Sequence, residues 1–197
     1  MVKVALVILM FLSNLLSVVD AHGTTRCEQF INVIRRANAF YFGINFPYWY
    51  AVAQAQTESN CRPSIVAFDA GQGIFQFMPA TSLEVRKQIG MDLDPMNPDH
   101  AARMNAFYMK RLHRQNWDGG LWLTYSFYNS GPGTMKKEYL RAGCTDYLKM
   151  KAVCKRKILT LKSGKLLDLC QVGYDYPVLI SQRSKSYRFG SDGMRYW

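Results

Sequence analysis

Glu58 is the residue of this sequence best suited to act as a general acid. The apolar residues before it recur at i, i+3, i+4 and i+7, which predicts one face of a helix; they are Tyr48, Ala51, Val52 and Ala55. Glu58 extends that face by one further turn. We expect burial there to disfavour the charged carboxylate and to raise its pKa, which suits proton donation near neutral pH. A carboxylate that turns to solvent at a helix end is the alternative.

Other polar side chains stand at predicted helix ends or tight turns. Ser59 follows Glu58, Gln76 ends the glycine-supported stretch GIFQ, Tyr128-Asn129 precede Ser-Gly-Pro-Gly, and Tyr176 precedes a proline. Together they could line a polar groove that accepts a hydroxyl-rich ligand such as a sugar. Each also has a structural interpretation, because Gly73 suits a turn, the SGPG stretch stops a helix, and a tyrosine before proline can serve packing.

The elements that must position these residues are predicted to be mainly helical. Apolar periodicity and Pro or Gly boundaries predict helices at about 26–41, 47–58, 79–88, 98–115, 120–128, 134–143, 145–157 and 176–187. Asn97 and Pro98 are typical of a helix start. Residues 64–75 indicate an irregular loop or very short hairpin, and Ser163-Gly164 permits a small hairpin between 158 and 169. The chain length suits one domain.

The N-terminal residues have the pattern of an export signal. Lys3 precedes an apolar run from Val4 to Val19, and the segment ends in Val-Asp-Ala. We therefore predict a signal peptide at residues 1–21 and one exported domain at residues 22–197, in the periplasm or outside the cell at the cell wall. An uncleaved membrane anchor is the alternative.

The five cysteines fit an exported protein, in which disulfides are permitted. They are Cys27, Cys61, Cys144, Cys154 and Cys170, and the odd number leaves at least one free or paired between chains. Cys154 and Cys170 could close a local loop, but Cys144 is an alternative partner for either, so the connectivity stays open. The sequence has no CxxC or HExxH motif and its histidines are scattered, so we expect no metal and no cofactor.

Positive charge is concentrated in the C-terminal third. The chain carries a net charge of +11; residues 135–197 hold 14 Lys and Arg against 5 Asp and Glu, while residues 22–134 hold 10 against 8. Such a basic segment favours an anionic partner. For an exported chain, an acidic cell-wall polymer or an anionic membrane face is a better candidate than nucleic acid. A solvated face that maintains solubility is the alternative.

The motifs TESN, GIFQFMPAT, FYNSGPG and YDYPVLI follow one another between about residues 48 and 180. In this order they resemble the SLT-type lytic transglycosylases, relatives of goose-type lysozymes, whose pattern is roughly ES, GLMQ-x-x-P-x-T, AYNAGPG and a late tyrosine. The departures Ile74-Phe75 for Leu-Met, Phe127 for Ala, and Ala70-Gly71 for Gly-Ala keep the polar residues. The resemblance implies a mainly α, lysozyme-like fold with at most a small β-hairpin. Residues 143–197 form a basic, cysteine-bearing C-terminal extension, of which the segment between Gly143 and Gln171 is less well covered by the resemblance.

The resemblance implies that Glu58 is the single catalytic acid and base. The implied reaction cleaves the β-1,4 bond between N-acetylmuramic acid and N-acetylglucosamine in peptidoglycan and leaves a 1,6-anhydro end. If Asp69 faced Glu58 across the cleft, hydrolysis by an activated water would become possible, as in a muramidase. A wall-binding or assembly protein without activity, which uses the basic C-terminal part, is a third reading.

The resemblance also assigns substrate-binding roles. Ser59 and Gln76 would bind or orient the sugar and its N-acetyl group. Tyr128 and Asn129 would line the site near the catalytic carboxyl, and Tyr176 would hydrogen-bond that carboxyl or the substrate. The expected partners are peptidoglycan glycan strands, and we expect the protein to act as a monomer.

Overall fold

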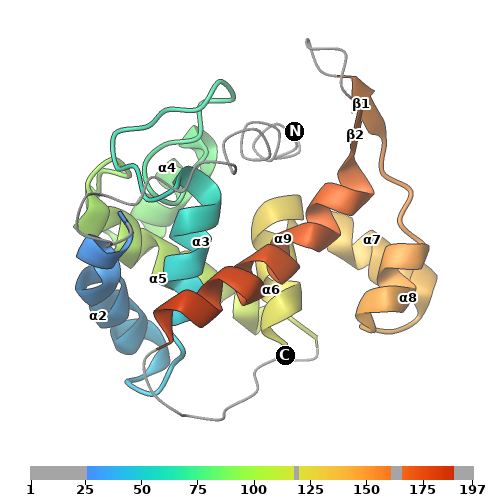
Figure 1. The fold of residues 1–197 in the computed structure, drawn as a ribbon, viewed down its shortest axis with the longest axis horizontal. Coiled ribbons are helices and arrows are strands. Elements are labelled where there is room, and N and C mark those ends of the chain that lie inside the picture. The colour runs from blue at the N-terminus through green and yellow to red at the C-terminus, as the bar shows by residue number, and fades with distance from the viewer. Residues whose placement is uncertain (1–25, 118–119, 161–165, 189–197) are drawn as a thin grey trace.

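A computed structural model describes residues 26–117, 120–160 and 166–188 of the chain. Within these ranges the chain forms helices and one two-stranded antiparallel sheet (Figure 1). This confirms the prediction of a mainly α, lysozyme-like fold with a small hairpin. The predicted signal peptide at residues 1–21 and the turn at Ser163-Gly164 lie outside the described residues. In the described part of the chain, no helix is both long and apolar enough to span a membrane.

The elements follow one another with short connections, apart from the loop between α3 and α4. In chain order they are η1 (Glu28–Phe30), α2 (Ile31–Phe42), α3 (Trp49–Ser59), α4 (Pro79–Ile89), α5 (Pro98–Arg114), α6 (Leu121–Ser130), α7 (Pro132–Ala142), α8 (Tyr147–Ala152), β1 (Ile158–Thr160), β2 (Leu166–Asp168), α9 (Leu169–Ser184) and η2 (Lys185–Tyr187). In the sheet, Leu159 pairs with Leu167.

Helix α3 lies in the interior, where α9 crosses it (Figure 1). The three alanines Ala51, Ala53 and Ala55 are buried, and their small size lets neighbouring helices approach closely. Gln54, a polar residue beside Glu58 on the helix, and Thr57, on another face, are buried as well. The sequence pattern predicted one apolar face, whereas α3 is buried on nearly all sides, as expected for a central helix.

Helices α2, α4 and α6 all pack against α5, the longest helix (Figure 1). Its start is the predicted one: the Asn97 side chain accepts hydrogen bonds from the backbone N–H groups of Asp99 and His100, and Pro98 occupies the first turn. Of these helices, α6 also packs against α9, so it connects this layer to the C-terminal part of the domain.

Three C-terminal helices have bounds that differ from the predicted ones. Helix α7 begins at Pro132, because proline suits a first turn, and Thr134 lies inside the helix instead of capping it. Helix α8 is capped by Asp146 and ends at Ala152, well short of the predicted end near residue 157. The chain then continues toward the hairpin.

The largest difference concerns α9, which begins seven residues before the predicted start at Tyr176. The Asp168 side chain accepts hydrogen bonds from the backbone N–H groups of Cys170 and Gln171, so it caps the helix there. Pro177 lies inside α9. Tyr176 is therefore held in the middle of a long helix, between α3 and α6, and not at a helix start.

Two disulfides cross-link the domain. Cys27 bonds to Cys61, immediately beyond α3, and Cys154 bonds to Cys170, at the start of α9. The second is the local loop that the sequence allowed, and Cys144 remains a free thiol. On the chain-entropy model, a loop of 16 residues contributes about 3 kcal/mol to stability.

Candidate active site

Glu58 occupies the last turn of α3 and is only 2% exposed. The helix ends beyond it because Asn60 and Cys61 both adopt left-handed backbone conformations, with φ of 52° and 54°. The Cys27–Cys61 disulfide anchors this end. The predicted burial of the carboxyl is therefore observed, and the end of the helix that carries it is covalently tied to the start of the domain.

The hydroxyl of Tyr176 donates a hydrogen bond to Oε1 of Glu58. Gln54 lies one helical turn before Glu58, and its Nε2 donates to the Tyr176 hydroxyl oxygen over 3.4 Å. Asn105 of α5 in turn donates to Oε1 of Gln54 over 3.0 Å. Because the amide donates to the phenol oxygen, the phenol keeps its own proton for the carboxyl. Three helices thus fix the orientation of one hydrogen bond.

Two tyrosines near Glu58 remain protonated at neutral pH. Burial raises the pKa of Tyr176 well above its usual range, and the nearby charge of Glu58 raises it further. The pKa of Tyr128 is raised for the same two reasons, with burial again the larger cause. The carboxyl is therefore placed among neutral phenols. Such groups can donate hydrogen bonds to a carboxylate without becoming charged themselves.

Three predicted site residues hold the GIFQ loop through consecutive backbone carbonyls. Gln76 Nε2 donates to the carbonyl of Gly73 over 2.7 Å, the Ser59 hydroxyl donates to that of Ile74 over 2.9 Å, and the Tyr128 hydroxyl donates to that of Phe75 over 2.7 Å. All three side chains are buried. The structure thus brings Ser59, Gln76 and Tyr128 together on one loop, in bonds that fix its shape.

The backbone of this loop is unusual at two positions. Gln76 has a positive φ of 50°, which is uncommon for a residue with a side chain and often occurs at functional sites. Gly73 has a φ of 69°, and a Cβ atom there would lie 1.8 Å from the carbonyl oxygen of Pro95. The close contact between these two loops therefore requires glycine at position 73.

Asn129 lies near the C-terminal end of α6, directly after Tyr128, and is 6% exposed. Its Oδ1 accepts a hydrogen bond from the Ser130 hydroxyl over 3.3 Å. Asp69 lies in the loop before Gly73, where its Oδ1 accepts a bond from the backbone N–H of Gly71 over 3.3 Å. The side chain of Asp69 thus stabilises its own turn.

Sequence inspection missed several buried polar residues. Gln54 could have been found, because it is a polar residue on the same helical face as Glu58, four positions earlier. Glu138, Arg156 and Tyr174 form a second buried polar cluster: Arg156 Nε lies 2.8 Å from Glu138 Oε1, and the Tyr174 hydroxyl donates to Oε2 over 2.7 Å. Nothing in their spacing indicated this cluster.

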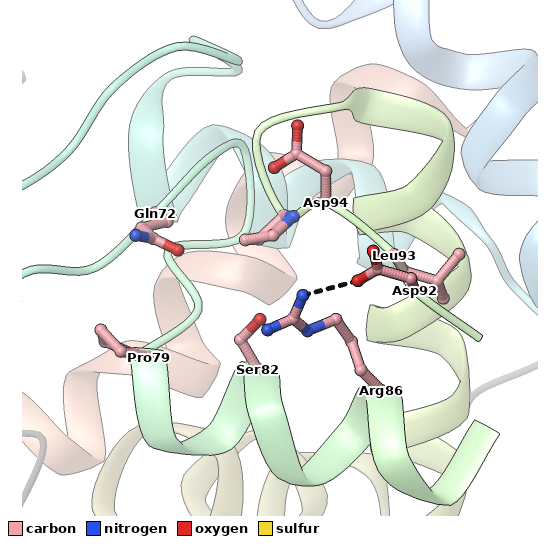
Figure 2. Close-up of a pocket in the computed structure, with 8 residues that line it drawn as sticks. Gln72, Pro79, Ser82, Arg86, Asp92, Leu93 and Asp94 are labelled. Carbon is pink, nitrogen blue, oxygen red and sulfur yellow. Dashed lines mark hydrogen bonds and ion pairs between the residues drawn. The ribbon is translucent and has the colours of Figure 1, made fainter. Parts of the chain in front are cut away.

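A polar recess of about 440 Å³ lies between α4 and the loop that follows it (Figure 2). It is lined by Gln72, Pro79, Ser82, Arg86, Asp92, Leu93, Asp94 and Pro95. Arg86 pairs with Asp92 at 2.9 Å. None of the predicted site residues lines this recess. In the three described ranges, no group of three or more His, Cys, Asp or Glu side chains could hold a metal ion.

The family model described as "Transglycosylase SLT domain" matches residues 38–150. No curated protein sequence gives a significant match. Solved structures do: the 70 kDa soluble lytic transglycosylase from Escherichia coli has a TM-score of 0.58 at 18% identity, over 78% of this chain and 24% of its own. The complex of the 70 kDa soluble lytic transglycosylase with bulgecin A gives 0.60 at 17% identity, over 82% and 25%.

An inactive Glu-to-Gln mutant of the lytic transglycosylase Slt from Pseudomonas aeruginosa gives a TM-score of 0.54 at 19% identity, over 79% of this chain and 23% of its own. The chain therefore spans about a quarter of the length of these solved proteins. At such low identity the likeness shows a shared fold.

Proposed function

Because the chain belongs to the family of SLT transglycosylase domains, we propose that it is a peptidoglycan lytic transglycosylase that uses Glu58 as both acid and base. The substrate is the β-1,4 bond between N-acetylmuramic acid and N-acetylglucosamine. The observation that carries the proposal is the buried carboxyl of Glu58 at the end of α3, oriented by the hydroxyl of Tyr176.

The reaction needs one group that first gives and then takes a proton. Protonated Glu58 donates its proton to the leaving glycosidic oxygen as the bond from that oxygen to C1 of the muramoyl unit breaks. The C6 hydroxyl of the same unit then bonds to C1 and loses its proton to the Glu58 carboxylate. The product carries a 1,6-anhydro ring, Glu58 is protonated again, and no water is consumed.

The surroundings of Glu58 suit this cycle. Tyr176 and Tyr128 stay protonated because burial and the nearby carboxylate raise their pKa. The Tyr176 hydroxyl can therefore donate to the carboxylate that forms in the first half of the reaction, and its loss would cost transition-state stabilisation. We further propose that Ser59 and Gln76 contact the sugar, either by their side chains or through the loop that they support, and that Tyr128 and Asn129 line the site near Glu58.

A single carboxyl is sufficient for this mechanism. Ordinary glycosidases pair two carboxyl groups about 5 to 10 Å apart. The carboxyl closest in sequence beyond Glu58, that of Asp69, bonds to the backbone of its own turn. Asp69→Asn keeps an acceptor for that bond, so this variant should retain activity and anhydro products.

Digestion of purified peptidoglycan tests the proposal. Wild type, Glu58→Gln and Asp69→Asn are compared, and the released muropeptides are analysed by mass spectrometry. Anhydro ends that disappear only in Glu58→Gln support the proposal, whereas reducing ends that need Asp69 would indicate a muramidase. Release that persists in Glu58→Gln contradicts the assignment of Glu58. Binding to peptidoglycan without release of muropeptides would indicate a wall-binding protein without catalytic activity.

We also propose that the protein is exported through residues 1–21 and that its basic extension, residues 143–197, contacts an anionic wall or membrane surface. Two disulfides suit an oxidising compartment. Just before the extension, α7 exposes Lys136, Lys137 and Arg141 while its only acidic residue is buried, so its outer face is cationic.

Salt dependence tests this surface contact, because salt of about 0.1 M screens exposed charges beyond about 10 Å. The fraction of the protein that co-sediments with purified cell walls should fall as the salt concentration rises. The double variant Lys149→Gln/Lys155→Gln, which removes two exposed charges of the extension, should bind less than the matched control Arg35→Gln/Lys87→Gln, which removes two exposed charges elsewhere. Binding that is insensitive to salt would exclude an electrostatic contact.

A further inference from the structure

Arg156 lies beyond the residues that the family model matches, yet its side chain reaches the YNSG motif. Its Nη1 donates to the Ser130 hydroxyl over 2.8 Å and to the carbonyl of Leu169 over 3.0 Å. The approach is tight, because a Cβ at Gly173 would lie 1.9 Å from Nη1 and 2.8 Å from Ser130 Oγ. Only glycine at position 173 leaves room for this contact.

Arg156 is itself held rigidly. Its Nε and Nη2 form a two-bond contact with the carboxylate of Glu138, at 2.8 and 3.1 Å, and Glu138 is 1% exposed. Bidentate pairs of this kind fix geometry as well as charge. The Cys154–Cys170 disulfide encloses the segment, and the backbone N–H of Arg156 contacts Cys170 Sγ over 3.2 Å.

The direction of the first hydrogen bond follows from chemistry, because a guanidinium has only donors and the Ser130 oxygen must therefore accept from Arg156. In the structure the hydroxyl of Ser130 in turn donates to Oδ1 of Asn129, at 3.3 Å. With its amide oxygen facing Ser130, Asn129 directs its NH₂ group away from that hydroxyl.

We propose that Arg156 is a positioning residue that acts through Ser130 to orient the Asn129 amide, so that Asn129 offers a hydrogen-bond donor to the substrate. The substrate group that accepts this hydrogen bond would be an oxygen, such as the carbonyl oxygen of an N-acetyl group or a sugar oxygen. In the family pattern AYNAGPG an alanine stands where this chain has Ser130. The Ser130 hydroxyl, which connects Arg156 to Asn129, is thus a feature of this chain that the family pattern lacks. This role of Asn129 rests on the proposed function.

A double-mutant cycle on peptidoglycan digestion tests the proposal with Ser130→Ala, Asn129→Ala and both together. Ser130→Ala leaves the pair of Arg156 and Glu138 intact, so folding should be preserved. We expect it to lower kcat/KM about tenfold, the effect of one lost hydrogen bond. In the Asn129→Ala background it should have no further effect, because its influence passes only through Asn129.

The matched control is Ser126→Ala, which removes another buried hydroxyl of α6, one that donates to the carbonyl of Trp122 in its own helix. It should leave kcat/KM unchanged. Arg156→Lys, which retains a positive charge beside Glu138 but lacks the guanidinium fork, should reproduce the loss of Ser130→Ala. A Ser130→Ala effect of equal size with and without Asn129 would overturn the proposal.

A second measurement does not depend on activity. The side-chain NH₂ signals of Asn129 are identified in ¹⁵N spectra as the pair missing from Asn129→Ala. In wild type the order parameter of this nitrogen should be near the rigid value of about 0.85, and in Ser130→Ala it should fall toward about 0.6. An unchanged order parameter would overturn the inference. If wild type fails to cleave peptidoglycan, the proposed function fails, while this measurement still decides the orientation of Asn129.

Discussion

Two buried carboxyl groups, Glu58 and Glu138, are each bonded to a tyrosine of α9. Glu58 is 2% and Glu138 is 1% exposed, and they accept hydrogen bonds from Tyr176 and Tyr174 respectively. Two residues apart on a helix, these tyrosines point in nearly opposite directions. The difference lies in the remaining partners. Glu138 has a bidentate bond to Arg156, whereas the Tyr176 donor to Glu58 is itself oriented by the neutral amide of Gln54.

This comparison shows that burial alone does not identify a catalytic carboxyl. An arginine within 3 Å holds Glu138 as one half of a structural ion pair. Phenols that stay neutral permit Glu58 to be charged or uncharged as a reaction proceeds. We therefore expect substitutions at Glu58 to act on rate and those at Glu138 to act mainly on stability.

The largest effect is expected for Glu58→Gln. The variant keeps the shape of the side chain and an oxygen that accepts from Tyr176, but it cannot exchange a proton. We expect kcat on peptidoglycan to fall by about 10²- to 10⁴-fold, the usual contribution of acid–base catalysis. Thermal unfolding should be little changed. A variant that retains activity would contradict the contrast with Glu138.

Glu138→Gln should cause the next largest change, a loss of about 3 to 5 kcal/mol in the free energy of unfolding. The cause is the largely enclosed guanidinium of Arg156, 12% exposed, which would lose its counter-charge. Denaturant titration measures the loss. The double variant Glu138→Gln/Arg156→Met is the control and should recover most of the stability. A Glu138→Gln protein as stable as wild type would show that the ion pair of Glu138 and Arg156 does not contribute to the stability of the fold.

Substitution of the two tyrosines tests the same comparison between Glu58 and Glu138. Tyr176→Phe removes the donor to Glu58 and should lower kcat about tenfold or more, in line with the loss of one hydrogen bond to a charged group. Tyr174→Phe removes the equivalent bond to Glu138 and should lower the free energy of unfolding by about 1.5 to 3 kcal/mol. Its effect on kcat should be smaller than that of Tyr176→Phe. Equal kinetic effects would mean that both carboxyls serve the reaction.

The smallest effect concerns alkaline pH, where the two tyrosines should behave alike. Burial raises the pKa of Tyr174, and that of Tyr176, above the unfolded value of about 10. Above that pH the unfolded phenols lose their protons while the folded ones retain them, so stability is complete below about pH 10 and declines as pH rises further. Denaturant titrations across this range measure the slope, which each Tyr→Phe variant should reduce. A flat profile would contradict the raised pKa values.

Features with a local cause were predictable from sequence. The cap at Asn97, the Pro79 start of α4 and the small hairpin depend on residues close together in the chain, whereas the Cys154–Cys170 bond was one of several pairings that the sequence left open. The early start of α9 was missed because an apolar run hid the Asp168 cap, and the expected break at Tyr176-Pro177 proved to be helix interior.

By itself the sequence determined the helical fold, the burial of Glu58 and the order of the motifs, since spacing and turn residues are local properties. Only the tertiary structure decided which groups meet. Tyr176 reaches Glu58 across 118 positions because α9 crosses α3, and Arg156 reaches Ser130 across 26 because Gly173 of α9 leaves room for the guanidinium. Such contacts depend on the packing of whole helices, which no local pattern encodes.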